Sequence, residues 1–126
     1  MIDFDDFKNI NDTSGHQAGD KALKEASIII KESIRASAIC GRYGGDEFII
    51  LCDIENAESL EIICERIRIN IDEKSREKSG IHFTVSLGAA TAKINQQYEQ
   101  SLSSLINKAD ENLFKAKKNG KNNWVS

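Results

Sequence analysis

The sequence of 126 residues contains no proline, one tryptophan, one methionine and three cysteines. Without proline, glycine is the residue left to mark sharp turns. No apolar run is long enough to cross a membrane, and the chain opens with acidic residues where a secretion signal would be basic. We therefore expect a cytoplasmic domain without membrane contact, either free or as the cytoplasmic part of a larger, even membrane-bound, protein.

The cysteines Cys40, Cys52 and Cys64 are odd in number and form no C-x-x-C pair. Each lies in an apolar run, which predicts buried and reduced thiols in a reducing cytosol. Positive charge is also in short supply. The chain has 17 Lys and Arg against 20 Asp and Glu, a formal net charge of −3, which argues against a nucleic-acid partner. The length indicates one domain with a real core.

Hydrophobic periodicity divides the chain into helices and strands. It predicts helices over residues 17–36, 57–78 and 101–118, and strands over 38–43, 47–53, 81–91 and 122–126. Residues 3–12 are acidic and only partly periodic, a turn is predicted at 11–15, and residues 1–3 have the character of the end of a strand. Helices interleaved with a hairpin predict an α/β domain with one sheet covered by helices.

The predicted hairpin carries two glycines followed by two acids, Gly44, Gly45, Asp46 and Glu47. Glycine accepts the positive φ of tight hairpin turns, and the simplest interpretation is a solvated turn. Asp3, however, lies where the first strand ends, and a neighbouring strand would bring it near the tip. Converging carboxylates repel one another unless a hard divalent cation lies among them, so a metal-phosphate site is the other interpretation.

Four segments together resemble the GGDEF domains, the diguanylate cyclase family. They are residues 42–48 (RYGGDEF), 3–20 (DFDDFKNINDTSGHQAGD), 83–90 (FTVSLGAA) and 109–122 (ADENLFKAKKNGKN), which span nearly the whole chain in order. The resemblance implies a palm-like nucleotidyl-cyclase fold with a central mixed or antiparallel sheet flanked by helices. It also implies condensation of two GTP molecules, one on each of two facing domains, into cyclic di-GMP and two pyrophosphates.

The resemblance assigns the metal and catalytic residues. Asp3, the Phe4 carbonyl, Asp46 and Glu47 match the ligands of Mg²⁺ or Mn²⁺, with two ions expected per active site. Asp46 also matches the acceptor of the 3′-hydroxyl proton, and a bound metal could itself lower the pKa of that hydroxyl. Gly44 and Gly45 match residues that leave room for the α-phosphate and ribose.

The same resemblance assigns the nucleotide contacts. Asn11 and Asp20 match the pair that reads guanine, since a carboxylate can accept from both guanine N1–H and its amino group. His16 matches a residue that lines the nucleotide. Taken alone, these three are ordinary turn and helix-start residues.

The expected phosphate contacts are the backbone amides of Phe7 and Lys8 and the side chains of Lys117 and Lys121. Lysines at the end of a helix also complement its dipole without any ligand. Many family members have arginine at the position of Lys121, and a lysine offers a point charge instead of a bidentate fork.

Two departures from the family are expected to matter. Its inhibitory product site has the form R-x-x-D, whereas this chain has Arg35 and then Ala38, with Arg66 or Arg68 as further arginines for a residual site. The family's N-terminal helix and most of its first strand have no counterpart in residues 1–126. Two functions therefore stay open: an active cyclase, expected to pair with a second copy and an upstream sensor domain, or a GTP-binding or interaction module that is inactive in this form. His82 matches nothing and is expected on a strand surface.

Overall fold

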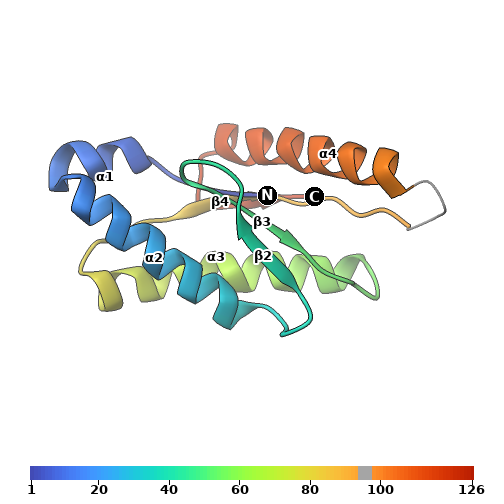
Figure 1. Ribbon diagram of the computed structural model, residues 1–126, viewed down its shortest axis with the longest axis horizontal. Helices are drawn as coiled ribbons and strands as arrows, with labels where there is room; N and C mark the ends of the chain where they lie inside the picture. The colour runs from blue at the N-terminus through green and yellow to red at the C-terminus, as the bar shows by residue number, and fades with distance from the viewer. Residues whose placement is uncertain (94–97) are drawn as a thin grey trace.

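The computed structural model describes residues 1–93 and 98–126. The elements, in order, are β1 (Ile2–Phe4), α1 (Phe7–Ser14), α2 (His16–Ser33), β2 (Ile39–Arg42), β3 (Glu47–Leu51), α3 (Ala57–Ser79), β4 (Val85–Gly88), α4 (Tyr98–Lys118) and β5 (Trp124–Val125). The strands form one sheet in the order β2-β3-β1-β4-β5. Helix α4 covers one face of the sheet and α2 and α3 cover the other, while α1 lies at one end (Figure 1). The α/β sheet-and-helix architecture is confirmed.

Strand β1 lies in the middle of the sheet and is antiparallel to both neighbours. Ile2 pairs with Phe48 of β3 and with Leu87 of β4, and Asp3 pairs with Glu47 and Ser86. Only β4 and β5 are parallel, so the sheet is mixed and mostly antiparallel. Because side chains alternate along a strand, Ile2 and Phe4 enter the core while Asp3 faces the α4 side.

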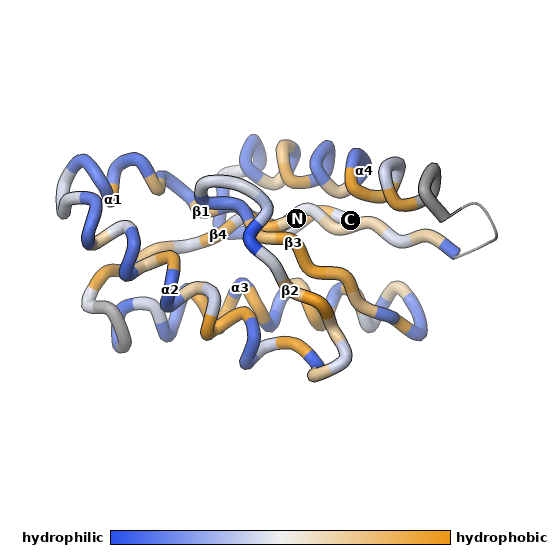
Figure 2. The backbone as a smooth tube through the Cα atoms, viewed as in Figure 1, coloured by the Kyte–Doolittle hydropathy of each residue, from blue (hydrophilic) through white to orange (hydrophobic). Residues whose placement is uncertain are grey.

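The core lies between the sheet and the pair α2 and α3. The Phe4 ring contacts the rings of Phe7, Phe48 and Phe83, with centroids 5.2, 6.4 and 4.7 Å away. Figure 2 shows hydrophobic residues on the inner sides of the long helices, whereas α1 is largely hydrophilic. In the part of the chain that is described, no helix is both long and apolar enough to cross a membrane.

Helix α4 rests directly on β4 at Gly88. A Cβ on this residue would overlap the Ala109 carbonyl oxygen and would lie 2.6 Å from Leu113 Cα. Both obstacles are main chain and cannot turn away, so only glycine allows this close contact.

Several boundaries differ from the predicted ones. The turn predicted at 11–15 is wrong, because α1 continues to Ser14 and only Gly15, with φ 83°, breaks the helix. The strand predicted at 81–91 shrinks to β4, because Phe83 instead exchanges hydrogen bonds with the Ser75 hydroxyl. His82 accordingly lies ahead of the strand, with Nε2 2.7 Å from Asp72 Oδ1.

Two further expectations are corrected by the structure. Of the three cysteines, which are all free thiols, Cys64 alone is buried, Cys40 is half-buried and Cys52 is exposed at the end of its strand. The hairpin glycines Gly44 and Gly45 do not use the left-handed backbone that a tight turn was expected to require.

Candidate functional site

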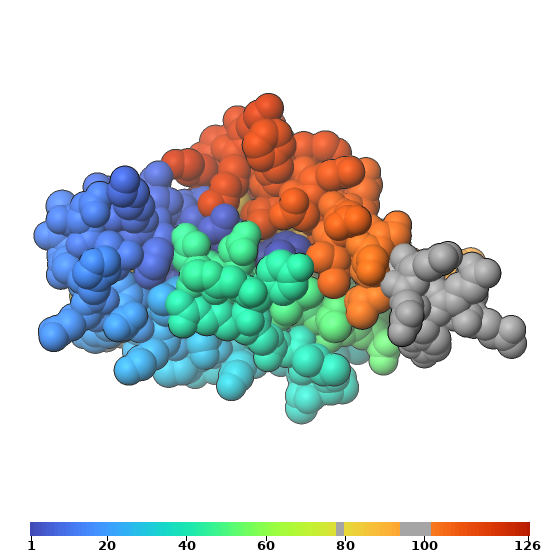
Figure 3. Space-filling model, turned by 45° about the horizontal axis from the view of Figure 1, so that its top comes forward, coloured from blue at the N-terminus to red at the C-terminus, as the bar shows by residue number. Residues whose placement is uncertain are grey.

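Four chain segments meet on one face of the molecule: the end of β1, the start of α1, the β2–β3 hairpin tip and the end of α4. Figure 3 shows this face, where the turquoise hairpin atoms lie between the blue atoms of α1 and the red atoms of α4. The sequence motifs that carry the predicted metal, phosphate and catalytic residues are therefore brought together, although they are far apart along the chain.

Asp3 and Glu47 lie directly opposite each other on neighbouring strands. The next residue along the tip, Asp46, accepts a backbone hydrogen bond from Phe4 N at 3.4 Å. Burial raises the pKa of the Asp3 carboxyl, the Lys117 ammonium lowers it, and the charges of Asp46 and Glu47 raise it further. Like charges placed opposite each other destabilise a sheet, which makes this edge favourable for a cation.

Lys117 shows where such a cation would be held. Its Nζ lies 2.7 Å from Asp3 Oδ2 and donates to the Phe4 carbonyl oxygen at 2.9 Å. These are two of the predicted metal ligands, and both already face one positive charge. Asp3 Oδ1 is buried and has no hydrogen-bond partner among the described residues. The oxygens present therefore fit a divalent cation, although within residues 1–93 and 98–126 no three acidic, histidine or cysteine side chains already form a metal-binding group.

The glycine pair shapes the hairpin tip in an unexpected way. A Cβ on Gly44 would lie 2.6 Å from Glu47 Oε2, so the missing side chain gives room to the catalytic-candidate carboxylate. A Cβ on Gly45 would meet nothing, which leaves that side of the tip open for a ligand. Arg42 Nε donates to the Gly45 carbonyl oxygen at 2.9 Å and closes the turn.

The start of α1 presents free backbone amides. The first intrahelical bonds run from Asn9 and Ile10 to the Asp6 carbonyl, so the amides of Phe7 and Lys8 precede the hydrogen-bonded ladder. Such a helix N-terminus attracts anions. Lys121 extends toward the same place, with Nζ 2.6 Å from Asp6 Oδ1, and this bond raises the pKa of the lysine.

The predicted guanine-reading residues lie at the α1–α2 junction. Asn11 packs against Gly19, where a Cβ would overlap the Asn11 amide oxygen, and Asp20 is the next residue of α2. Asp20 and His16 are exposed, and His16 is the first residue of α2. The structure thus places the predicted pair at neighbouring positions with Asp20 open to a ligand.

The predicted degenerate inhibitory site lies elsewhere. Arg35 is exposed and forms a turn in which Ala38 N donates to its carbonyl oxygen at 3.0 Å. Arg66 reaches this end of α2 and donates to the Ser33 carbonyl at 2.8 Å. Arg68 instead pairs with Glu65 on its own helix.

Sequence reasoning missed Asp5 and Asn122 as residues of this region. Asp5 is buried and accepts hydrogen bonds from Thr84, Ser86 and the Asn122 amide. The available signal was the run Asp3, Asp5 and Asp6 at a strand end, because carboxylates so close together need hydrogen-bond or cation partners wherever they are buried.

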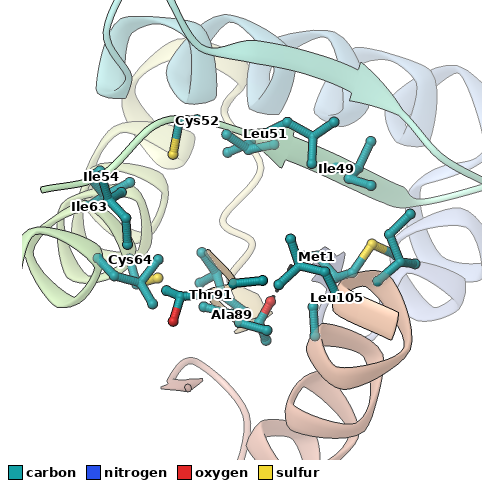
Figure 4. A pocket seen from close by; sticks show the side chains of 18 of the residues that line it. Met1, Ile49, Leu51, Cys52, Ile54, Ile63, Cys64, Ala89, Thr91 and Leu105 are labelled. Atoms are coloured by element: carbon teal, nitrogen blue, oxygen red, sulfur yellow. Dashed lines mark hydrogen bonds between the residues drawn. The ribbon is translucent and has the colours of Figure 1, made fainter. Parts of the chain in front are cut away.

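An apolar groove of about 720 Å³ lies at the opposite end of β1. Its walls come from β3, α3, the segment after β4 and α4, and Figure 4 shows Ile49, Leu51, Cys64 and Leu105 around it. It lies at the Met1 end of β1, at the far end of the strand from Asp3, Lys117 and Lys121.

Known proteins that resemble this chain show its family. A model of the family described as "Diguanylate cyclase, GGDEF domain" matches residues 1–123. The chain belongs to the GGDEF domain family.

Among curated relatives, the chain is 41% identical over 124 residues to diguanylate cyclase A of Treponema denticola, which covers 97% of this chain and 33% of that protein. It is 40% identical over 126 residues to diguanylate cyclase DosC of Escherichia coli, with 97% and 26% covered. The chain thus spans a third or less of the length of these curated relatives.

Among solved structures, the active GGEEF domain of a diguanylate cyclase from Vibrio cholerae matches with a TM-score of 0.82 and 30% identity, covering 98% of this chain and 78% of that one. The GGDEF domain of DgcB from Caulobacter crescentus, solved with cyclic di-GMP, matches with a TM-score of 0.81 and 28% identity over 98% and 73%. The fold predicted from the resemblance is confirmed.

Proposed function

We propose that this chain is a diguanylate cyclase domain that condenses two GTP molecules into cyclic di-GMP and releases two pyrophosphates. One observation carries the proposal: the opposed carboxylates Asp3 and Glu47 form a cation-binding edge beside the free amide end of α1 and two lysines. A cation site next to an anion site is what a metal-bound triphosphate requires. Family membership supplies the reaction.

The residues divide the work between charge and shape. The proposal has two divalent ions per site, either Mg²⁺ or Mn²⁺, and these would neutralise the charge of phosphate oxygens. Asp3, the Phe4 carbonyl, Asp46 and Glu47 would hold them, and the Lys117 ammonium, which now contacts Asp3 and Phe4, would become free for a phosphate.

The remaining contacts orient the nucleotide. The amides of Phe7 and Lys8 and the Lys121 ammonium would bind the terminal phosphates, and Asp46 would accept the proton of the attacking 3′-hydroxyl. Asn11 and Asp20 would read guanine beside His16, and open space at Gly45, with Gly44 beside it, would receive the ribose and α-phosphate.

The reaction joins two nucleotides, so we propose that a second copy of the chain faces this site and supplies the other GTP. The length of the curated relatives supports an additional regulatory region, and one structural neighbour is a diguanylate cyclase solved with its activator. We place an upstream sensor domain in that role and the cyclase domain in the cytoplasm.

The direct test is incubation of the protein with GTP and Mg²⁺, followed by chromatography of the products, with ATP as the control substrate. Cyclic di-GMP and pyrophosphate in a molar ratio of one to two are expected from GTP, with little conversion of ATP. Binding of GTP without any product would instead indicate the alternative function, a GTP-binding module.

Product inhibition should be weak. Ala38 has no carboxylate to accept from guanine or to hold Arg35, and Arg68 is engaged by Glu65. A lost charge-assisted hydrogen bond weakens binding by about tenfold or more. We predict that Ala38→Asp strengthens cyclic di-GMP binding by at least about tenfold in calorimetry. Submicromolar binding by the unmodified chain at a site containing Arg35 would contradict this.

A further inference from the structure

Three residues other than glycine have a left-handed backbone in the described part of the chain. They are Asp6, Lys121 and Asn122, with φ of 56°, 64° and 44°. All three lie at one junction, because the Lys121 ammonium contacts the Asp6 carboxylate 115 positions away. Residues with a Cβ avoid this conformation, and they keep it only where surrounding contacts hold them.

Three polar groups of Asn122 supply such contacts. Its backbone N–H donates to Asp5 Oδ2 at 2.9 Å, and its side-chain Nδ2 donates to Asp72 Oδ2 at 2.9 Å. Its Oδ1 accepts from Arg68 Nη1 at 3.1 Å. Asparagine also tolerates the left-handed region better than most residues. The residue after Lys121 is thus fixed from two sides.

Both sides are themselves firmly held. Asp5 is 7% exposed, and its carboxylate also accepts from the Thr84 and Ser86 hydroxyls, each at 2.7 Å. On α3, Arg68 makes a bidentate pair with Glu65, in which Nε donates to Oε2 at 2.9 Å and Nη2 donates to Oε1 at 2.7 Å. Asn122 therefore links the loop to helix α3 and to Asp5 just after β1, and through Asp5 to strand β4.

We infer that Asn122, anchored by Asp5, Asp72 and Arg68, is a positioning residue that aims the Lys121 ammonium at the phosphate bound by the first amides of α1. The identity of that phosphate as part of GTP rests on the proposed function. Lys121 and α1 belong to segments at opposite ends of the chain. They can act on one phosphate only if the loop that carries Lys121 is held in place, and the contacts of Asn122 with Asp5, Asp72 and Arg68 form this rigid joint. Without the joint, Lys121 can relax to a right-handed backbone and its side chain leaves the α1 end.

The first test compares GTP with GMP, which lacks the terminal phosphates. Calorimetry in Mg²⁺ should show that Asn122→Ala weakens GTP by about tenfold while GMP binding stays close to that of the unmodified chain. Asn122→Gly should recover part of the loss, because glycine accepts positive φ without the side-chain anchors. Asn119→Ala, in the same loop but with an exposed side chain, is the matched control and should change neither affinity. Equal losses for GTP and GMP, or no loss, would overturn the inference.

The second test needs no ligand. Amide hydrogen exchange should accelerate in residues 119–123 of Asn122→Ala and of Asp72→Ala, while the amides of α4 and β4 keep their protection. If the unmodified chain binds no GTP, the proposed function fails, and exchange still decides on the joint. Unchanged exchange in the loop of both variants would show that Asn122 does not hold it.

Discussion

The two ends of strand β1 differ in their surroundings, which are charged and polar at one end and apolar at the other. At one end, Asp3 and the residues after it lie beside the carboxylates of the hairpin tip, the lysines at and after the end of α4 and the free backbone amides at the start of α1. At the other end, Met1 opens onto an apolar groove between β3 and β4. Both faces of this central strand are covered by helices, and the groups that meet at its polar end come from segments far apart along the chain.

The backbone hydrogen bonds between the start of β1 and the end of β4 show which main-chain groups face the groove. Met1 and Gly88 exchange two backbone bonds, of 2.8 and 3.0 Å. Because bonded pairs alternate in antiparallel ladders, the next main-chain groups that point into the groove belong to Ile50 and Ala90. The groove is thus flanked by main-chain groups of β3 on one side and of the segment after β4 on the other.

The largest effect is expected at the polar end. Asp46→Asn keeps the side-chain shape but removes a charge and a proton acceptor, so cyclic di-GMP formation should fall by at least about 100-fold. Asp53→Asn, an exposed acid that lines the groove, is the matched control and should leave turnover unchanged. Product chromatography from GTP and Mg²⁺ measures both, and near-normal turnover by Asp46→Asn would remove this residue from the catalytic set.

A side chain added at Gly88 should affect the stability of the fold far more than one added at Gly45 in the polar end. Gly88→Val would drive side-chain atoms into the α4 main chain, and we expect a loss of about 3 kcal/mol in the free energy of unfolding. Gly45→Ala at the polar end adds a Cβ that meets nothing and should stay within about 0.5 kcal/mol. Urea unfolding measures the two variants, and equal stabilities would mean that α4 is free to move off β4.

The polar end was largely predictable from sequence, because its main pair depends on strand ends alone. Asp3 follows an apolar strand pattern and Glu47 opens another, so adjacency of the two strands was enough to place them together. Lys117 and Lys121 came from resemblance to the family. What escaped was the joint at Asn122, whose bond to Asp5 spans 117 positions and leaves no periodic signal.

Local chemistry misled the prediction where tertiary packing overruled it. Asn11, Asp12 and Ser14 are turn formers, yet burial of Ile10 against the core keeps this segment helical up to Gly15. The strand predicted at 81–91 is too long for the same reason. The segment contains β-forming residues, but the Phe83 backbone exchanges hydrogen bonds with the Ser75 hydroxyl and not with a neighbouring strand.

A smaller effect would sharpen the contrast at the groove. Four alternating apolar and polar residues placed ahead of Met1 should pair with Ile50 and Ala90 and bury apolar area between α3 and α4. We expect a gain of about 2 kcal/mol in the free energy of unfolding. A Gly-Ser extension of the same length is the control and should give no gain. Equal urea midpoints for the two extensions would show that the groove does not accept a strand.

The smallest effect concerns Cys64, which lines the groove. Burial raises the pKa of this thiol from 9.0 to about 11. A raised pKa means that the folded protein holds the proton more tightly, so this contribution to stability is complete below pH 9 and is lost as pH rises toward 11. By pH 10 the unmodified chain should have lost about 1 kcal/mol relative to Cys64→Ala, compared with their difference at pH 8. The exposed thiol of Cys52 supplies the control, since Cys52→Ala should leave most of that loss in place. Urea unfolding at the two pH values measures the change. If the stability difference between the unmodified chain and Cys64→Ala is the same at pH 8 and pH 10, water reaches Cys64 and the groove is wetter than its apolar walls imply.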